Sequence, residues 1–200
     1  MQSFMTYLDQ LACLFEQMDQ AYGQVCRQSG FVCRGCQDNC CGTRFYHHTL
    51  IEYLYLKVGL DSLSEQAREA VRQRADQAHH QMRRDDAQGR KQRIMCPLNQ
   101  DGRCILYARR PMICRLHGVP HQLRRPDGRL QIGPGCGDFE LQCPGSVPAR
   151  LDRTPLYTTL ADLERRLRQR TGVMTRIRMT VAEMLVDESI EIPGLLNPKD

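Results

Sequence analysis

The chain has 200 residues, 41% of them apolar and 26% charged, with a formal net charge of +5 and eleven cysteines. This apolar share excludes a disordered chain, and no apolar run reaches the roughly 20 residues that a membrane-spanning helix needs. The first twenty residues carry acids but no Lys or Arg, the reverse of a secretory signal. We therefore expect one cytoplasmic domain over residues 1–200, with its thiols reduced.

Helical periodicity dominates both ends of the chain. Apolar residues recur every three or four positions over 3–29, which predicts an amphipathic helix that ends at Gly30. A second helix is predicted over 49–58, ended by Gly59, and a capping box from Ser62 to Glu65 predicts a long polar helix after it.

The C-terminal part is also predicted to be helical. Thr154 as N-cap, Pro155 at the first position and Gly172 as the stop define a helix to about residue 169. We expect a short strand over 173–179 and a capping box, Thr180 to Glu183, that opens a last short helix.

The middle of the chain changes character. Residues 91–150 are rich in Pro, Gly and Cys, and Pro126-Asp127-Gly128 predicts a hairpin turn. The expected fold is mainly α with a small β hairpin: helical flanks over 3–29 and 154–188 pack around a cysteine-rich, metal-binding middle over 31–146.

The cysteines carry the strongest functional signal. Reduced thiols clustered in sequence are typical of metal sites, because thiolates are soft ligands suited to zinc and to iron–sulfur clusters. Two of them precede Pro, as in ferredoxin-type loops. Cys13 and Cys26 lie within the first helix, where we interpret both as spare or structural thiols. The predicted metal ligands are Cys33, Cys36, Cys40, Cys41, Cys96, Cys104, Cys114, Cys136 and Cys143.

Nine thiols exceed the four that one tetrahedral zinc or one [4Fe–4S] cluster needs. The sequence leaves open whether one centre is accompanied by structural thiols or two centres are present. Adjacent side chains in extended backbone point in opposite directions, so Cys40 and Cys41 are not expected to serve one metal equally.

These residues resemble a known family. Cys33 to Cys41, the segment CPLNQDGRCILYARRPMICRLHG from Cys96 to Gly118, and Cys143-Pro144-Gly145 look like the YkgJ-like cysteine-cluster proteins, named for a CxxCxxCC-type motif. The resemblance covers about residues 31–146. Two features depart from the family pattern: three residues rather than two precede the Cys40-Cys41 pair, and Cys136 is extra.

The resemblance implies a zinc- or iron-chelating domain. A related cysteine-rich module occurs in the flagellin lysine methylase, an iron–sulfur protein, which favours an iron–sulfur cluster, [4Fe–4S] in type, over zinc. The first hypothesis is an iron–sulfur protein that acts in electron transfer, sensing or support of a partner, and the alternative is a structural zinc module that binds a partner. An iron–sulfur-dependent enzyme ranks last, because no methylase catalytic residue matches here.

Other residues near the cysteines have two interpretations each. Arg110 and Arg115 flank Cys114. Their guanidinium groups can either donate hydrogen bonds to the sulfurs of a cluster, without binding its metal, or form ion pairs with surface acids. Tyr107 either covers the centre or belongs to the core. Histidine ligands are disfavoured, since thiols are in excess. A protein or redox partner is expected, with no membrane and no nucleic acid, because no concentrated basic patch is present.

Overall fold

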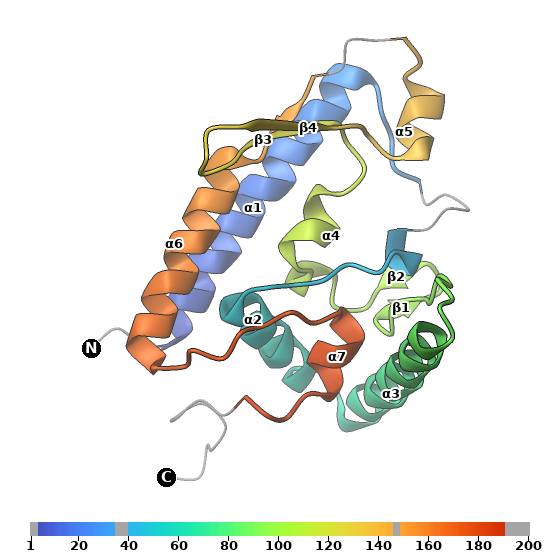
Figure 1. Cartoon of the computed structure of the whole chain (residues 1–200), viewed down its shortest axis with the longest axis vertical. Coiled ribbons are helices and arrows are strands. Elements are labelled where there is room, and N and C mark those ends of the chain that lie inside the picture. Colours follow the sequence, from blue (N-terminus) through green and yellow to red (C-terminus); the bar gives the residue numbers. More distant parts are fainter. Residues whose placement is uncertain (1–3, 35–39, 146–148, 191–200) are drawn as a thin grey trace.

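The computed structural model describes residues 4–34, 40–145 and 149–190, and it is mainly helical with two small sheets (Figure 1). The longer helices are α1 (Phe4–Ser29), α2 (Leu50–Asp61), α3 (Glu65–Ala87) and α6 (Thr154–Thr171). The short ones are η1 (Cys40–Gly42), η2 (Tyr107–Arg109), α4 (Met112–Leu116), α5 (Gly137–Gln142) and α7 (Val181–Val186). The strands are β1 (Asn99–Gln100), β2 (Arg103–Cys104), β3 (His121–Arg124), β4 (Leu130–Gly133) and β5 (Leu151–Asp152). The predicted fold class is confirmed.

The two flanking helices pack on each other, as predicted. In Figure 1, α1 and α6 run side by side along one edge of the molecule. The inner face of α6 buries four leucines at helical spacing, and α1 buries the matching stripe. Each fully buried leucine contributes roughly 1.5–3 kcal/mol of apolar burial, so this pair is a principal source of stability. The residues are Leu156, Leu160, Leu163 and Leu167 on α6, with Leu8, Leu11, Phe15 and Met18 on α1.

The helix α2 lies inside the fold and corrects one prediction. It continues through Gly59 to Asp61 instead of ending there. Gly59 is buried, and a Cβ at this position would lie 2.7 Å from Cγ of Arg109. The glycine is therefore explained by the close approach of a side chain and not by helix termination.

Helix starts follow the expected chemistry with two shifts of position. Ser64, and not Ser62, caps α3 by accepting from the Ala67 N–H, and Arg153 precedes the first turn of α6 in place of Thr154. The capping box of Thr180 and Glu183 at α7 is confirmed.

Two sheets replace the single predicted hairpin. The turn at Pro126-Asp127-Gly128 connects β3 and β4 as expected, and β5 adds to β3 in parallel. A second hairpin, β1–β2, was not predicted. The strand expected over 173–179 is wrong, because only Met179 forms a bridge, with His47.

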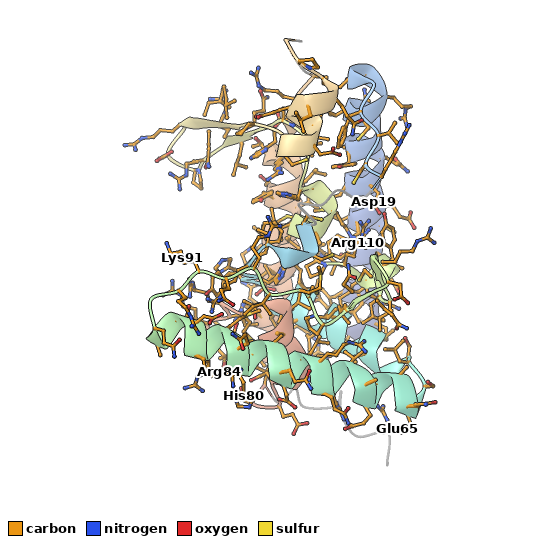
Figure 2. The ribbon with its side chains drawn as sticks, turned by 90° about the vertical axis from the view of Figure 1, so that its right-hand side faces the viewer. Asp19, Glu65, His80, Arg84, Lys91 and Arg110 are labelled. Atoms are coloured by element: carbon orange, nitrogen blue, oxygen red, sulfur yellow. The ribbon has the colours of Figure 1, made fainter. Side chains whose placement is uncertain are left out.

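The remaining long helix, α3, packs against α7 and presents a polar outer face along its length (Figure 2). Within the described residues, no helix combines the length and the apolar character needed to cross a membrane.

Candidate metal centre

The described cysteines other than Cys13 lie in two regions of the fold, and Cys33 acts electrostatically on a member of each, Cys40 and Cys26. The first thiol group is drawn from η1, the β1–β2 hairpin and α4, near the middle of Figure 1. The second thiol group is drawn from the end of α1, the segment after it and the two ends of α5, at the top of the same view. The first thiol group is Cys40, Cys41, Cys96, Cys104 and Cys114, and the second is Cys26, Cys33, Cys136 and Cys143.

Cys36 lies outside the described residues. Cys26 is half-buried and packs against the core of the fold, and its pKa is raised first by burial and then by the thiolates of Cys33 and Cys143. Cys13 is exposed on α1, which agrees with a spare thiol.

A tight hairpin positions two members of the first thiol group. Asp101 and Gly102 connect β1 to β2 with φ of 51° and 82°, the backbone of a two-residue turn that matches strand twist. Asn99 pairs with Cys104 across the strands, and the Cys96 N–H donates to the Cys41 carbonyl at 2.9 Å. Cys41, Cys96 and Cys104 are therefore fixed by backbone hydrogen bonds.

Backbone amides face the sulfurs of this hairpin. Burial raises the pKa of Cys96 to about 12, against an opposing contribution from the Leu98 N–H. Burial also raises the pKa of Cys104, and the Leu106 N–H again favours the thiolate. N–H groups directed at sulfur are what a bound metal–thiolate unit uses to disperse its negative charge.

The adjacent cysteines behave as an unequal pair. A hydrogen bond from Cys40 lowers the pKa of Cys41 to about 6, with further help from Asn99 and Arg110. The same hydrogen bond raises the pKa of Cys40. Cys41 is therefore the thiolate of the pair, and thiolates are the ligand form of cysteine.

Cys114 completes the first thiol group from α4. Burial, followed by the thiolates of Cys96, Cys104 and Cys41, raises the pKa of Cys114. Neighbouring thiols that each disfavour ionisation of the others are stabilised as thiolates when a cation lies between them.

One buried donor in the first thiol group is unused. The Asn99 Oδ1 accepts from the Gly102 N–H at 3.1 Å, which fixes the orientation of the amide. Its Nδ2 is buried and makes no hydrogen bond of normal geometry within the described residues, yet it favours the Cys41 thiolate. A buried donor without a partner is costly, so a negative charge on the Cys41 sulfur, which this amide favours, would relieve that cost.

The two arginines are held mainly by Asp19. Arg110 lies beside Asp19 (Figure 2) and donates to it at 3.4 Å. Its guanidinium stacks 3.6 Å from the centre of the Tyr107 ring. Arg115 is buried and donates to Asp19 at 2.5 Å. The interpretation as ion pairs with an acid therefore describes both, although both charges still favour the Cys104 thiolate. Tyr107 is 62% exposed and is not a core residue.

The histidines near the cysteines in sequence have other neighbours. His47 is buried at the bridge to Met179, the His117 ring packs on Phe45, and the His121 ring lies over Gly133. His48 is exposed.

Across the described ranges, no three or more His, Cys, Asp or Glu side chains are gathered closely enough to hold a metal ion. The donor set nevertheless fits a thiolate-bound metal in its chemistry, since soft sulfurs, sulfur-directed amides and the unused Asn99 donor occur together.

Comparison with protein-family models, with curated proteins and with solved structures finds no match for this chain. The family resemblance noted from the sequence therefore stays a prediction.

Proposed function

We propose that this protein is an iron–sulfur protein whose cluster, [4Fe–4S] in type, is held by Cys41, Cys96, Cys104 and Cys114. The observation that carries the proposal is the unused Asn99 Nδ2 beside a group of thiols drawn from three separate segments. Four thiolates match the ligand number of such a cluster, and Cys40 is the spare member of the adjacent pair.

The unused donor distinguishes a cluster from a single zinc ion. A tetrathiolate zinc site presents only its thiolate sulfurs as acceptors, whereas a cluster adds inorganic sulfides that accept hydrogen bonds from the protein. The thiolates of the first group already have the Leu98 and Leu106 amides. The Asn99 amide is then available for a sulfide.

The residues of this chain would bind, orient and shield the cluster. The β1–β2 hairpin fixes two ligands, α4 supplies a third from a buried position, and Arg110 and Arg115 offset negative charge. A bound cluster supplies a one-electron redox couple whose potential depends on these hydrogen bonds and on burial. The roles that follow are electron transfer, redox sensing or support of a protein partner, in the cytoplasm, where thiols stay reduced.

A structural zinc site is the second candidate. The observation that favours it is the short segment from Cys96 to Cys104, because two thiols, one just before the β1–β2 hairpin and one on its second strand, with amides directed at sulfur also suit zinc. In the zinc alternative the Asn99 amide can donate only to a thiolate such as that of Cys41, because no inorganic sulfide is present.

Metal and sulfide analysis tests the proposal. The wild type, purified without oxygen, should contain about four iron and four acid-labile sulfide per chain. Cys104→Ser and Cys114→Ser should lose both elements, while the matched control Cys13→Ser, at an exposed cysteine outside both groups, should keep them. A colourless wild type with stoichiometric zinc and no sulfide contradicts the proposal.

A further inference from the structure

An open groove lies between α3 and the segment that connects this helix to β1. The groove has a volume of about 600 Å³, and its lining comes from residues 74–84 on one side and from residues 94–99 on the other. Arg74 links the two sides, because its Nε donates to the Pro97 carbonyl at 2.9 Å. This hydrogen bond fixes the distance between the two sides at that point.

Two acids near the end of α3 are already neutralised by arginines from other segments. Asp85 is buried and pairs with Arg90 at 3.0 Å. Asp86 accepts from Arg44 through both carboxylate oxygens, at 2.6 and 2.7 Å. These two carboxylates therefore offset the charge of arginines outside the groove, and not the charge of the arginines that line it.

The basic side chains at the groove keep their charge. Among the described residues, the Arg74 and Arg84 guanidinium groups donate only to neutral oxygens, a backbone carbonyl and a glutamine side chain. Figure 2 shows His80 and Arg84 on neighbouring turns of α3, with Lys91 on the segment beyond the end of the helix. Asp76 is the one acid in the described lining. We call this surface, with its excess of positive charge, the basic groove.

The basic groove extends to the first thiol group. Cys96 and Asn99 belong to its lining, and so do the apolar Ile94 and Met95. The Met95 side chain is 48% exposed. Arg and Met are residue types that protein interfaces favour. The basic groove therefore combines access to the candidate metal centre with the chemistry of a surface that binds a protein.

We propose that the basic groove docks an acidic one-electron carrier protein, so that the redox centre of the carrier approaches the cluster beside Cys96. The inference rests on the proposed function, because a carrier has a use here only when the first thiol group holds a redox-active cluster. The exchange needs no further reactant, since the electron lost by one centre is gained by the other. Charge complementarity identifies the carrier as one with an acidic surface.

Other occupants suit the basic groove less well. A second copy of this chain, docked through the same groove, would place basic side chains opposite each other, and like charges across an interface repel. A nucleic acid requires a concentrated basic surface, whereas this lining includes Asp76, Ile94 and Met95. Complexes between electron carriers are small, below about 1,200 Å², and charge speeds their encounter, which matches a single short groove.

Binding of a defined carrier tests the inference. The probe is an acidic plant-type [2Fe–2S] ferredoxin, titrated by calorimetry into the full chain purified without oxygen, and a basic cytochrome c is the probe of opposite charge. The ferredoxin should bind with a dissociation constant that rises at least about tenfold between roughly 0.02 M and 0.2 M salt, because salt screens exposed charges. The cytochrome should not bind. No binding of the ferredoxin, or equal binding of the two carriers, overturns the proposal.

A matched pair of charge variants locates the binding surface. Arg84→Glu/Lys91→Glu should weaken ferredoxin binding at least about tenfold, because the new carboxylates face an acidic partner. The control Arg125→Glu/Arg170→Glu changes the net charge equally at exposed positions outside the groove, and it should weaken binding less than about threefold. Iron content and far-UV circular dichroism verify both variants. Equal effects of the two variants would refute the basic groove as the docking surface.

The exposed methionine gives an independent readout that does not change charge. Met95→Ala should weaken ferredoxin binding about fivefold or more if this side chain anchors the interface. The control is Met174→Ala, at a methionine that is 76% exposed and outside the groove, and it should leave binding unchanged. Equal affinities of the two methionine variants would contradict docking beside Cys96.

The inference and the proposed function fail in different ways. A wild type that contains iron and sulfide but does not bind the ferredoxin overturns the inference and leaves the proposed function standing. A wild type with zinc and no sulfide overturns the proposed function and the role of a redox carrier with it, even if the ferredoxin still binds through Arg84 and Lys91. Tighter binding of a short RNA oligonucleotide than of the ferredoxin at these residues overturns the choice of partner.

Discussion

The Asp19 carboxylate on α1 holds the buried Arg115 guanidinium on α4 at 2.5 Å. Arg115 also donates to the carbonyls of Arg110 at 2.9 Å and Ala108 at 2.6 Å, and its guanidinium lies 4.3 Å from the centre of the Phe15 ring. One side chain therefore connects α1, α4 and the segment before α4. Because Cys114 immediately precedes Arg115, the same bonds fix the position of this cysteine.

Replacing Arg115 by Lys should lower the free energy of unfolding by about 2 kcal/mol, because an ammonium cannot satisfy all three acceptors and each lost buried bond costs about 1–3 kcal/mol. Urea unfolding measures the change. The matched control is Arg165→Ala, which removes an exposed ion pair with Asp162 and should cost less than about 0.5 kcal/mol. Equal effects of the two substitutions would show that the buried position has no special role.

Asn99→Asp should weaken cluster retention while preserving the hairpin. The substitution keeps the acceptor for the Gly102 N–H but replaces the unused Nδ2 donor with a negative oxygen facing thiolates. Loss of a supporting contact at a metal site typically costs about 10–100-fold in affinity. Iron release to a chelator, followed by absorbance, gives the rate, and far-UV circular dichroism verifies the fold. An unchanged release rate would mean that Asn99 does not contact the cluster.

Gly59→Ala should destabilise the protein even though alanine is the better helix former. The new Cβ would lie 2.7 Å from Cγ and 3.1 Å from Cβ of Arg109, and overpacking costs about 1–3 kcal/mol. In an Arg109→Gly background all of the contacting side-chain atoms are absent, so the same change should stabilise by about 0.5–1 kcal/mol. A double-mutant cycle in urea tests this reversal of sign, and identical effects in both backgrounds would exclude the contact.

Acid should destabilise the protein partly through His47. Burial, then the neighbouring His48, lowers the pKa of His47 to about 4 from the usual 6.5. Between these two values the unfolded chain binds a proton at this position and the folded chain does not. The free energy of unfolding therefore falls as the pH drops from 6.5 toward 4, by about 3 kcal/mol for this group.

His47→Gln should remove that share of the pH dependence, as measured by urea unfolding at pH 7 and pH 5. The exposed His80 provides the matched control, because His80→Gln should leave the slope as in the wild type. A His47→Gln variant with the wild-type slope would contradict the assignment.

Structural features that depend on residues close together in the sequence were predicted correctly. The helix pair α1 and α6 follows from long apolar stripes, and the hairpin β3–β4 follows from Pro126-Asp127-Gly128. The capping box at Thr180 needs only four residues to be recognised. Each helix, the hairpin and the capping box depend on residues that are neighbours in the chain, and the apolar stripes of α1 and α6 mark the faces that pack together.

Features that depend on distant contacts were missed. From the sequence Gly59 was predicted to end a helix, but the glycine is explained by the Arg109 side chain that packs against it. The β1–β2 hairpin has two-residue strands, too short for alternation to be visible, although Asp101-Gly102 is a typical turn pair.

The packing of α3 on α7 has a consequence for how the protein is made. Ala78 and Met82 of α3 are buried with Ala182 of α7, and 93 residues separate the end of α3 at 87 from the start of α7 at 181. At a synthesis rate of roughly 5–20 residues per second, about 5–20 s pass between the synthesis of α3 and the synthesis of α7, which packs on it. The cysteines from Cys96 to Cys143 emerge during that interval, so a metal centre can be loaded into a nascent chain before the last helix closes over α3.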